Sequence, residues 1–399
     1  MNAWLLKGQR AKDLKESLVL VSLLFCTFGD LITGVTMGYF TGRLNALPAL
    51  IILIPPTIDM RGNIFATLAS RLGTYLHTGE IVVGKKSNLL RDNINSSFVL
   101  TFSMSLYLGI LAWIIARFLG MKVGIIDLML ISILAGIFSA FIMVFFTFIT
   151  TFFSYSKGWN PDNVTAPLIT LTGDIVTLPL LFFSMEIVLL LNEETKIIAF
   201  LIFLLLGVVI SIYSSKSKVA KRILVESIPI LIICGLLSSF SGIILGAKFE
   251  GIMEAAAILT IVPAFLEDGG AIASILSARF SSALHTGEMK CGEAKKNVLD
   301  LFIIVHIIGL IIFPLIGIFG YIAGITMGLK SYGIFKMILI SLIAGELLVV
   351  IVNILSFYIS TISFKIGLNP DNVSIPLLTS LMDFAGTACL IGVALLLNF

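Results

Sequence analysis

Long apolar segments alternate along this chain with short polar ones. Spanning a bilayer takes roughly 20 residues of apolar helix. Eleven segments are long and apolar enough, near residues 17–40, 46–71, 93–119, 124–154, 162–190, 196–214, 223–247, 254–280, 297–324, 332–363 and 371–398. The connections between them are too short to hold a folded domain. The pattern therefore predicts an all-α polytopic membrane protein with about 11 transmembrane helices.

Composition makes the bilayer the necessary solvent. Of the 399 residues, 58% are hydrophobic and 12% are charged, and the mean hydropathy is +1.10. A soluble domain carries about a quarter charged residues. The net charge of +3 is spread over short loops, which argues against a nucleic-acid partner. No glycine-rich phosphate loop occurs, so we expect no organic cofactor, and the partners expected are the lipid bilayer and small ions.

Basic residues predict the orientation. With the N-terminus on the cytoplasmic side, the cytoplasmic loops carry eighteen lysine and arginine residues and the opposite loops carry seven. The positive-inside rule then places the N-terminus in the cytoplasm and the C-terminus outside. The first apolar run has no small-x-small cleavage site, so we read it as a retained helix of a plasma-membrane protein.

An internal repeat organises the chain. Pro55–Glu80 aligns without gaps on Pro263–Glu288 with ten identities in 26 positions, and Asn160–Asp174 aligns on Asn369–Asp383 with nine in 15. Five spans fall in each copy, and the sixth span, 196–214, matches neither. One extra crossing makes the two copies parallel, related by a pseudo-two-fold axis along the membrane normal. The expected parts are a cytoplasmic N-terminus (1–16), a first repeat (17–191), a linker helix and loop (192–221) and a second repeat (222–399).

Asp174 and Asp383 are the first candidates for chemistry. Each lies 12 residues beyond the acidic residue that opens its span, Asp162 or Asp371. That spacing corresponds to about 18 Å of helix, near the middle of a ~30 Å hydrocarbon core. A lone carboxylate there costs several kcal/mol unless it is paired, protonated or solvated. Equivalent aspartates in parallel repeats can face each other across the axis and offer Mg²⁺ or Ca²⁺ the oxygen ligands these ions prefer. Packing against hydroxyls is the structural alternative. The neighbouring hydroxyls of interest are Thr170 and Thr379.

The second and eighth spans carry acidic residues next to prolines and glycines. We expect both helices to be broken at the prolines, which would turn carbonyl groups toward a cavity, as in the ion sites of transporters. Asp59 and Glu267 should then lie near the depth of the two aspartates above. The candidate cation ligands here are Asp59, Asn63, Glu267 and Asp268.

Arg61 distinguishes the two copies, because Gly269 takes its place in the second. We expect Arg61 to neutralise one of the acids. A buried Asp59–Arg61 pair without any transport role is the structural alternative.

A second set of candidates surrounds these residues. The Asn-Pro-Asp-Asn sequences at 160–163 and 369–372 are typical of helix starts, with proline in the first helical position. Capping explains them as well as a cytoplasmic gate does. His306 and Glu346 occur only in the second copy, where a proton or Na⁺ relay and a simple interhelical bond are equally consistent. The candidate gate residues are Asp162, Asn163, Asp371 and Asn372.

The motif Pro-x-x-x-Asp-x-x-Gly-Asn at residues 55–63, continued by Ser-Arg-Leu at 70–72 and followed by Asn-Pro-Asp-Asn and the later aspartate, resembles MgtE-type magnesium transporters. The likeness is closest to the tandem-repeat solute carriers of that superfamily and covers both repeats. In the bacterial relatives two five-helix chains dimerise around an axial ion path, and an aspartate of the last helix binds Mg²⁺. The resemblance gives that role to Asp174 and Asp383. Ala271 replaces the motif asparagine in the second copy. The sequence shows no counterpart of the bacterial cytoplasmic regulatory domains.

The sequence therefore predicts a divalent cation transporter, not an enzyme, with Mg²⁺ as the first candidate substrate and Mn²⁺ or Co²⁺ as others. One chain would work as a pseudo-dimer, and a further homodimer is left open. A Na⁺- or H⁺-coupled Mg²⁺ exchanger is one alternative, supported only by Glu346 and His306. An intramembrane aspartyl enzyme built on Asp174 and Asp383 is another, with two close carboxylates sharing a proton. The glycine motifs expected of such an enzyme are missing.

Overall fold

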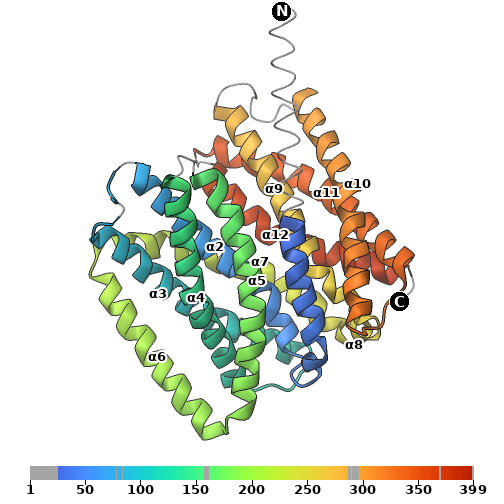
Figure 1. The fold of residues 1–399 in the computed structure, drawn as a ribbon, viewed down its shortest axis with the longest axis horizontal. Helices are drawn as coiled ribbons and strands as arrows, with labels where there is room; N and C mark the ends of the chain where they lie inside the picture. The colour runs from blue at the N-terminus through green and yellow to red at the C-terminus, as the bar shows by residue number, and fades with distance from the viewer. Residues whose placement is uncertain are drawn as a thin grey trace, which may run out of the picture.

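The computed structural model describes residues 26–397, apart from 78, 83, 157–160, 286–288, 290–295 and 368–369. All regular structure in these residues is helical (Figure 1). The first helix is described over residues 26–40. It is followed by η1 (Thr41–Asn45), α2 (Leu50–His77), α3 (Asn88–Phe118), α4 (Ile125–Ser156), α5 (Pro161–Leu190), α6 (Glu193–Ser215), α7 (Lys218–Ala247), α8 (Phe249–Glu254), η2 (Ala256–Thr260), α9 (Val262–His285), α10 (Lys296–Thr326), α11 (Ile334–Lys365) and α12 (Pro370–Leu396).

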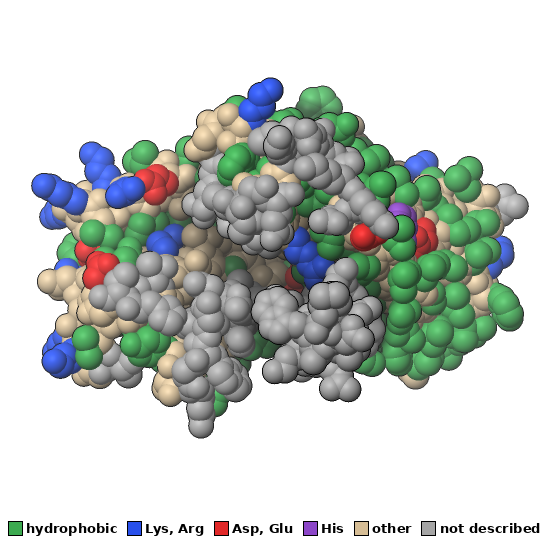
Figure 2. All heavy atoms as spheres, turned by 90° about the horizontal axis from the view of Figure 1, so that it is seen from above, with side chains coloured by type: hydrophobic (Ala, Val, Ile, Leu, Met, Phe, Trp, Pro, Cys, Tyr) green, Lys and Arg blue, Asp and Glu red, His purple; other side chains and the backbone are tan. Residues whose placement is uncertain are grey.

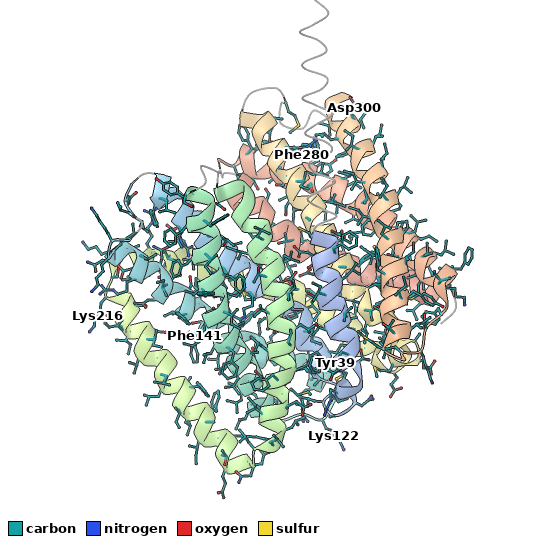
Figure 3. The ribbon with its side chains drawn as sticks, viewed as in Figure 1. Tyr39, Lys122, Phe141, Lys216, Phe280 and Asp300 are labelled. Atoms are coloured by element: carbon teal, nitrogen blue, oxygen red, sulfur yellow. The ribbon has the colours of Figure 1, made fainter. Side chains whose placement is uncertain are left out.

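Ten of the eleven expected spans each correspond to one long helix, and the described part of the first, residues 26–40, is also helical, which confirms the all-α membrane fold. Among the described residues, nine helices are long and apolar enough to cross a bilayer by length and composition. The remaining two expected spans are the first helix and α2. Figure 3 shows Asp300 at one end of the helix bundle and Lys122 at the other, as expected where helices leave the apolar region.

The expected breaks at the prolines are wrong. Helix α2 runs without interruption through Pro55 and Pro56, and α9 begins at Val262, next to Pro263. The irregular backbone lies just before each helix instead, at η1 and residues 46–49 in the first repeat and at α8 and η2 in the second. Pro263 is the second residue of α9, where an amide group lacks a helical partner anyway. Pro55 and Pro56 instead lie inside α2, beyond its first turn. The packing of fully buried residues before the prolines, Leu50 to Leu53, holds α2 together.

Two four-helix groups form the body of the molecule. Helices α2 to α5 pack on one another, as do α9 to α12. The unmatched helix α6 lies on the outside against α3 and α4, with most of its surface exposed. Lys196 near its start joins Asp127 of α4 at 2.8 Å and Glu193 at 2.7 Å. Helix α6 therefore contributes a crossing of the membrane and little of the core.

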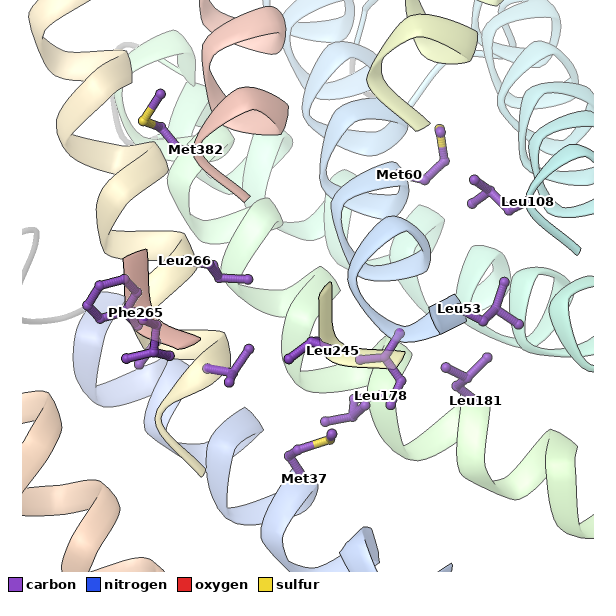
Figure 4. Packing of buried hydrophobic residues seen from close by; sticks show 14 of the residues in the cluster. Met37, Leu53, Met60, Leu108, Leu178, Leu181, Leu245, Phe265, Leu266 and Met382 are labelled. Atoms are coloured by element: carbon purple, nitrogen blue, oxygen red, sulfur yellow. The ribbon is translucent and has the colours of Figure 1, made fainter. Parts of the chain in front are cut away.

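The first helix of each repeat packs against the other repeat. Helix α7 opens the second repeat, yet it packs on α2 and α3 of the first, as well as on α12. The first helix in turn meets the second repeat: Phe28 contacts Phe319 of α10 edge-on with ring centroids 5.4 Å apart. This exchange ties the two repeats into one body. Figure 4 shows Met37, Leu178, Leu245 and Leu266 converging from the first helix, α5, α7 and α9.

Candidate functional site

Ser238 lies at the centre of the site, on helix α7. Its hydroxyl oxygen is 2.5 Å from Asp59 Oδ2 on α2 and 2.9 Å from Asp383 Oδ2 on α12. One hydroxyl carries one proton and donates fully to only one acceptor. Two ionised carboxylates on the same hydroxyl therefore repel each other unless a proton or a cation joins them. The first repeat's Asp59 and the second repeat's Asp383 thus meet through a serine.

Asp59 is well supplied with hydrogen bonds. Ser380 Oγ of α12 donates to Oδ2 at 2.9 Å, and Asn63 Nδ2, one helical turn onward, donates to Oδ1 at 3.0 Å. Asn63 was expected as a cation ligand and here serves as a donor to the neighbouring carboxylate. Its amide oxygen is left over for a cation or water.

Asp174 and Glu267, the counterparts of Asp383 and Asp59 in the sequence repeat, form the other side of the site. Asp174 of α5 is 4% exposed and interacts electrostatically with Glu267 and Asp383. Asp30, on the first helix, lies within hydrogen-bonding reach of Asp174 and is fully buried. Neither oxygen of Asp30 has a hydrogen-bond donor as partner. This side of the site therefore consists of carboxyl groups without the serine and asparagine donors found around Asp59.

Asp268 follows Glu267 on α9 and is also fully buried. Thr27 Oγ1 of the first helix donates to Asp268 Oδ2 at 2.7 Å, while Oδ1 has no partner. All the acidic candidates of the buried spans are thus linked by electrostatic interactions, each with at least one other. They are Asp59, Asp174, Glu267, Asp268 and Asp383, joined by Asp30.

Arg61 does not play the part expected of it. Its side chain is fully buried, and Nη2 donates to Ser105 Oγ of α3 at 2.7 Å, while Nε and Nη1 have no hydrogen-bond partner. The hydrogen bonds found for Asp59 come from Ser238, Ser380 and Asn63 instead. Neutralisation of an acid by Arg61 is therefore not seen, because the side chain leaves α2 on a different face from Asp59, toward Ser105 and Gly136.

Two threonines of the second set differ in their contacts. A β-carbon on Gly62 would lie 3.1 Å from Thr170 Cγ2, so α2 and α5 approach closely there. Thr379 Oγ1 donates to the carbonyl of Pro376 at 3.0 Å. Its hydroxyl is thus occupied within its own helix. Gly270 makes the matching approach to Thr379 in the second repeat.

The gate candidates lie at helix starts, as expected: α5 begins at Pro161 and α12 at Pro370. Their side chains fall outside the part of the structure that is described, so their gate role stays a hypothesis. These residues are Asp162, Asn163, Asp371 and Asn372.

His306 and Glu346 form a bond between α10 and α11. His306 Nδ1 lies 2.7 Å from Glu346 Oε2, and both side chains are about one-third exposed or less. Among the described residues, neither is a hydrogen-bond or electrostatic partner of the acidic cluster. The pair thus joins two helices away from the centre of the site.

Sequence reasoning missed Asp30, Ser238 and Ser380. The signal lay in the repeat itself, because extending the 208-residue offset upstream pairs Asp30 with Ser238. Cys26 and Cys234 form a further pair at the same offset, four residues earlier. These cysteines interact electrostatically with the acids on their respective sides of the site.

The acidic, hydroxyl and amide side chains of the site offer oxygen ligands, the type that hard cations such as Mg²⁺ and Ca²⁺ prefer. No three acidic, histidine or cysteine side chains in the described part of the chain converge closely enough to hold a bare metal ion. Contact through bound water suits this spacing better than direct coordination. Figure 2, a view onto the upper end of Figure 1, shows charged side chains both around the edge of this face and near its middle, with apolar side chains most extensive on the right.

Comparison with known proteins covers both repeats. The sequence profile of the MgtE family, described as divalent cation transporter, matches residues 54–184 and 262–393. Mouse solute carrier family 41 member 3 is 25% identical over 93% of this chain and 80% of its own length. Solute carrier family 41 member 2 from Xenopus laevis is 26% identical over 97% and 73%, and the human member 2 is 24% identical over 93% and 68%. No solved structure matches significantly.

Proposed function

Because the chain belongs to the MgtE family of divalent cation transporters, we propose that it carries Mg²⁺ along an acidic path between its two repeats. Asp174 and Asp383 hold the partly hydrated ion, and Asp59, Glu267 and Asp268 set the negative field around it. Mn²⁺ and Co²⁺ are further candidate substrates. Members of this family are transporters, so the aspartyl-enzyme alternative is set aside.

The observation that carries the proposal is the contact between the repeats through acidic side chains. Ser238 joins Asp59 to Asp383, and Asp174 interacts electrostatically with Asp383 across the pseudo-axis. Several buried carboxylates at one level are expensive in a bilayer. A divalent cation offsets that cost, whereas helix packing alone needs no such cluster.

The membrane potential is a sufficient driving force for uptake. A potential of about 100 mV contributes about 4.6 kcal/mol to the inward movement of a divalent ion, twice the value for one charge. Mg²⁺ sheds its water shell reluctantly, so we expect it to pass with part of that shell. The protein would lie in the plasma membrane with its N-terminus in the cytoplasm and work as one pseudo-dimeric chain. A cytoplasmic gate at the starts of α5 and α12 fits this scheme.

The test is Mg²⁺ flux into liposomes that hold the purified protein at a set potential. We expect flux to follow the potential and to be abolished in Asp174→Asn and in Asp383→Asn. Asp300→Asn is the matched control, because this carboxylate lies at the end of the bundle. Normal flux in either site variant, with the protein folded, would contradict the assignment.

Coupled exchange is the second candidate function. The bond between His306 and Glu346 is the observation that favours it, since a histidine–carboxylate pair can carry a proton. Flux that requires an opposing Na⁺ or H⁺ gradient would support exchange. Flux that persists with the gradient removed would rule it out.

A further inference from the structure

The two sides of the acidic site differ at one aligned position. Ser238 of α7 and Asp30 of the first helix are separated by the same 208 residues that relate the repeats. Neighbouring contacts follow the same symmetry. Thr27 of the first helix donates to Asp268 of α9. At the positions 208 residues away, Gly235 of α7 faces Met60 of α2, and a β-carbon on Gly235 would lie 3.0 Å from the methyl group of Met60. The two helices therefore present residues 30 and 238 to equivalent places. One side receives a hydroxyl donor and the other a carboxylate.

Ser238 supplies a hydroxyl donor to the side of the site that it faces. Its hydroxyl contacts Asp59 and Asp383, the acids of α2 and α12. The symmetric counterparts of those acids are Glu267 of α9 and Asp174 of α5. Asp30 faces these two: it lies within hydrogen-bonding reach of Asp174 and interacts electrostatically with Glu267.

Among the described residues, no hydroxyl, amide or basic group stabilises the charge of Asp30. It is fully buried, both of its oxygens lack a hydrogen-bond donor, and its neighbours are themselves carboxyl groups. A buried, unpaired carboxylate is costly, and nearby like charges add to that cost. The serine at the equivalent position shows that a small neutral side chain fits this place in the fold. The carboxylate at position 30 is thus not required by packing and points to a positively charged ligand.

We propose that Asp30, Asp174 and Glu267 form an off-axis site for a hydrated divalent cation, and that Asp30 sets its affinity. The inference rests on the proposed function and deepens it, since it moves the tightest ion position from the axis between Asp174 and Asp383 toward the first helix. Three carboxylates around one divalent ion leave a net negative site, which favours a doubly charged ion over Na⁺ or K⁺. The ion contacts these groups through its water shell, because they do not converge closely enough for direct ligation.

The packing of the first helix against the second repeat determines which residues form the off-axis site. The first helix belongs to the first repeat in sequence but packs against the second, where Gly34 meets the carbonyl of Thr260. Asp30 lies one turn before Gly34 on that helix, and Asp174 lies on α5 of the first repeat. The off-axis site thus takes residues from both repeats, and it requires the chain to be assembled as a whole.

The test measures Mg²⁺ binding separately from transport, using the full chain. The shift of Tm on adding Mg²⁺ reports binding to the purified protein, and flux into liposomes reports transport. The variant Asp30→Asn removes the charge and keeps the shape. The control Thr36→Val lies on the same helix at a half-buried position, where the hydroxyl bonds to the carbonyl of Ile32.

We expect Asp30→Asn to weaken Mg²⁺ binding about tenfold or more and to raise Tm in the absence of divalent ions, because carboxylate repulsion is relieved. Thr36→Val should leave both quantities unchanged. Asp30→Ser should bind as weakly as Asp30→Asn, and adding Ser238→Asp in the same chain should recover part of the affinity by rebuilding three carboxylates on the opposite side.

Two results separate failure of this inference from failure of the proposed function. If the wild-type protein carries Mg²⁺ and Asp174→Asn does not, while Asp30→Asn binds and transports like wild type, then Asp30 only shares a proton with Asp174 and the off-axis site is overturned. If the wild-type protein neither binds nor carries Mg²⁺ or another divalent ion, the proposed function itself is lost.

Discussion

Gly34 of the first helix lies directly against the backbone carbonyl oxygen of Thr260, and a β-carbon at Gly34 would overlap that oxygen. The relationship repeats 208 residues later, where Gly242 of α7 lies against the carbonyl of Ile52. Ile52 is four residues before Pro56, which has no N–H to bond that carbonyl within α2. Close Cα–H contacts to the carbonyl are a recurring feature of helix interfaces in membranes. The paired contacts lock each first helix onto the opposite repeat.

Gly34→Ala and Gly242→Ala should therefore each lower thermal stability. The added methyl group meets backbone, which cannot rotate away, and overpacking of this kind costs about 1–3 kcal/mol. Gly392→Ala is the matched control, because no atom lies within 4 Å of a β-carbon there and alanine favours helix. The Tm of the purified variants measures the effect. Equal Tm values for all three would contradict the close approach of the helices.

Ser238→Ala should destabilise the protein and impair transport. It removes the hydroxyl that contacts Asp59 and Asp383 and leaves two buried carboxylates short of a donor, at a cost of about 1–3 kcal/mol. Ser239→Ala provides the comparison, since that neighbouring hydroxyl bonds only to the carbonyl of Gly235. We expect a clearly lower Tm and lower Mg²⁺ flux in the first variant than in the second. Identical behaviour would mean that Ser238 does not join the two repeats.

Arg61→Met should be tolerated and even raise Tm. The guanidinium is fully buried and bonds to Ser105 alone among the described residues, so methionine, which keeps an unbranched apolar stem, removes an unpaired charge. Mg²⁺ flux should stay within about twofold of wild type. Loss of an interaction with the ion worth about 1.4 kcal/mol would instead lower flux about tenfold. A collapse of flux without loss of stability would restore the expectation that Arg61 balances an acid of the path.

Glu346→Gln should lower Tm by weakening the tie between α10 and α11, with a free-energy cost of about 1 kcal/mol. Potential-driven Mg²⁺ flux should be unaffected, because this pair stands apart from the acidic cluster. Flux assays with and without a pH gradient provide the measurement. Loss of a proton-dependent component in this variant alone would instead favour the exchanger.

Helix positions and the repeat could be predicted because they depend on local features. Long apolar runs indicate where a chain crosses a bilayer. The matching sequence motifs that end at Asp174 and Asp383 show which span of the first repeat corresponds to which span of the second. The start of α5 at Pro161 followed from proline at the first helical position. The expected helix breaks at Pro55 and Pro56 were wrong for the same reason, because they were predicted from the prolines alone. The packing of the buried residues Leu50 to Leu53 keeps α2 continuous through both prolines, and a local pattern does not show that packing.

The sequence by itself therefore determined the all-α membrane fold and which residues of the two repeats correspond, since both follow from local patterns along the chain. The parallel arrangement of the two units and the depth of the acidic residues stay predictions from residue spacing. Only the tertiary structure decided which acids have partners. Whether Arg61 faces Asp59 or Ser105, and whether Asp30 faces lipid or Asp174, depends on how each helix is rotated about its axis and on which repeat it packs against. That rotation is set by contacts between residues some 200 positions apart, such as Gly34 with Thr260, and no local pattern encodes it.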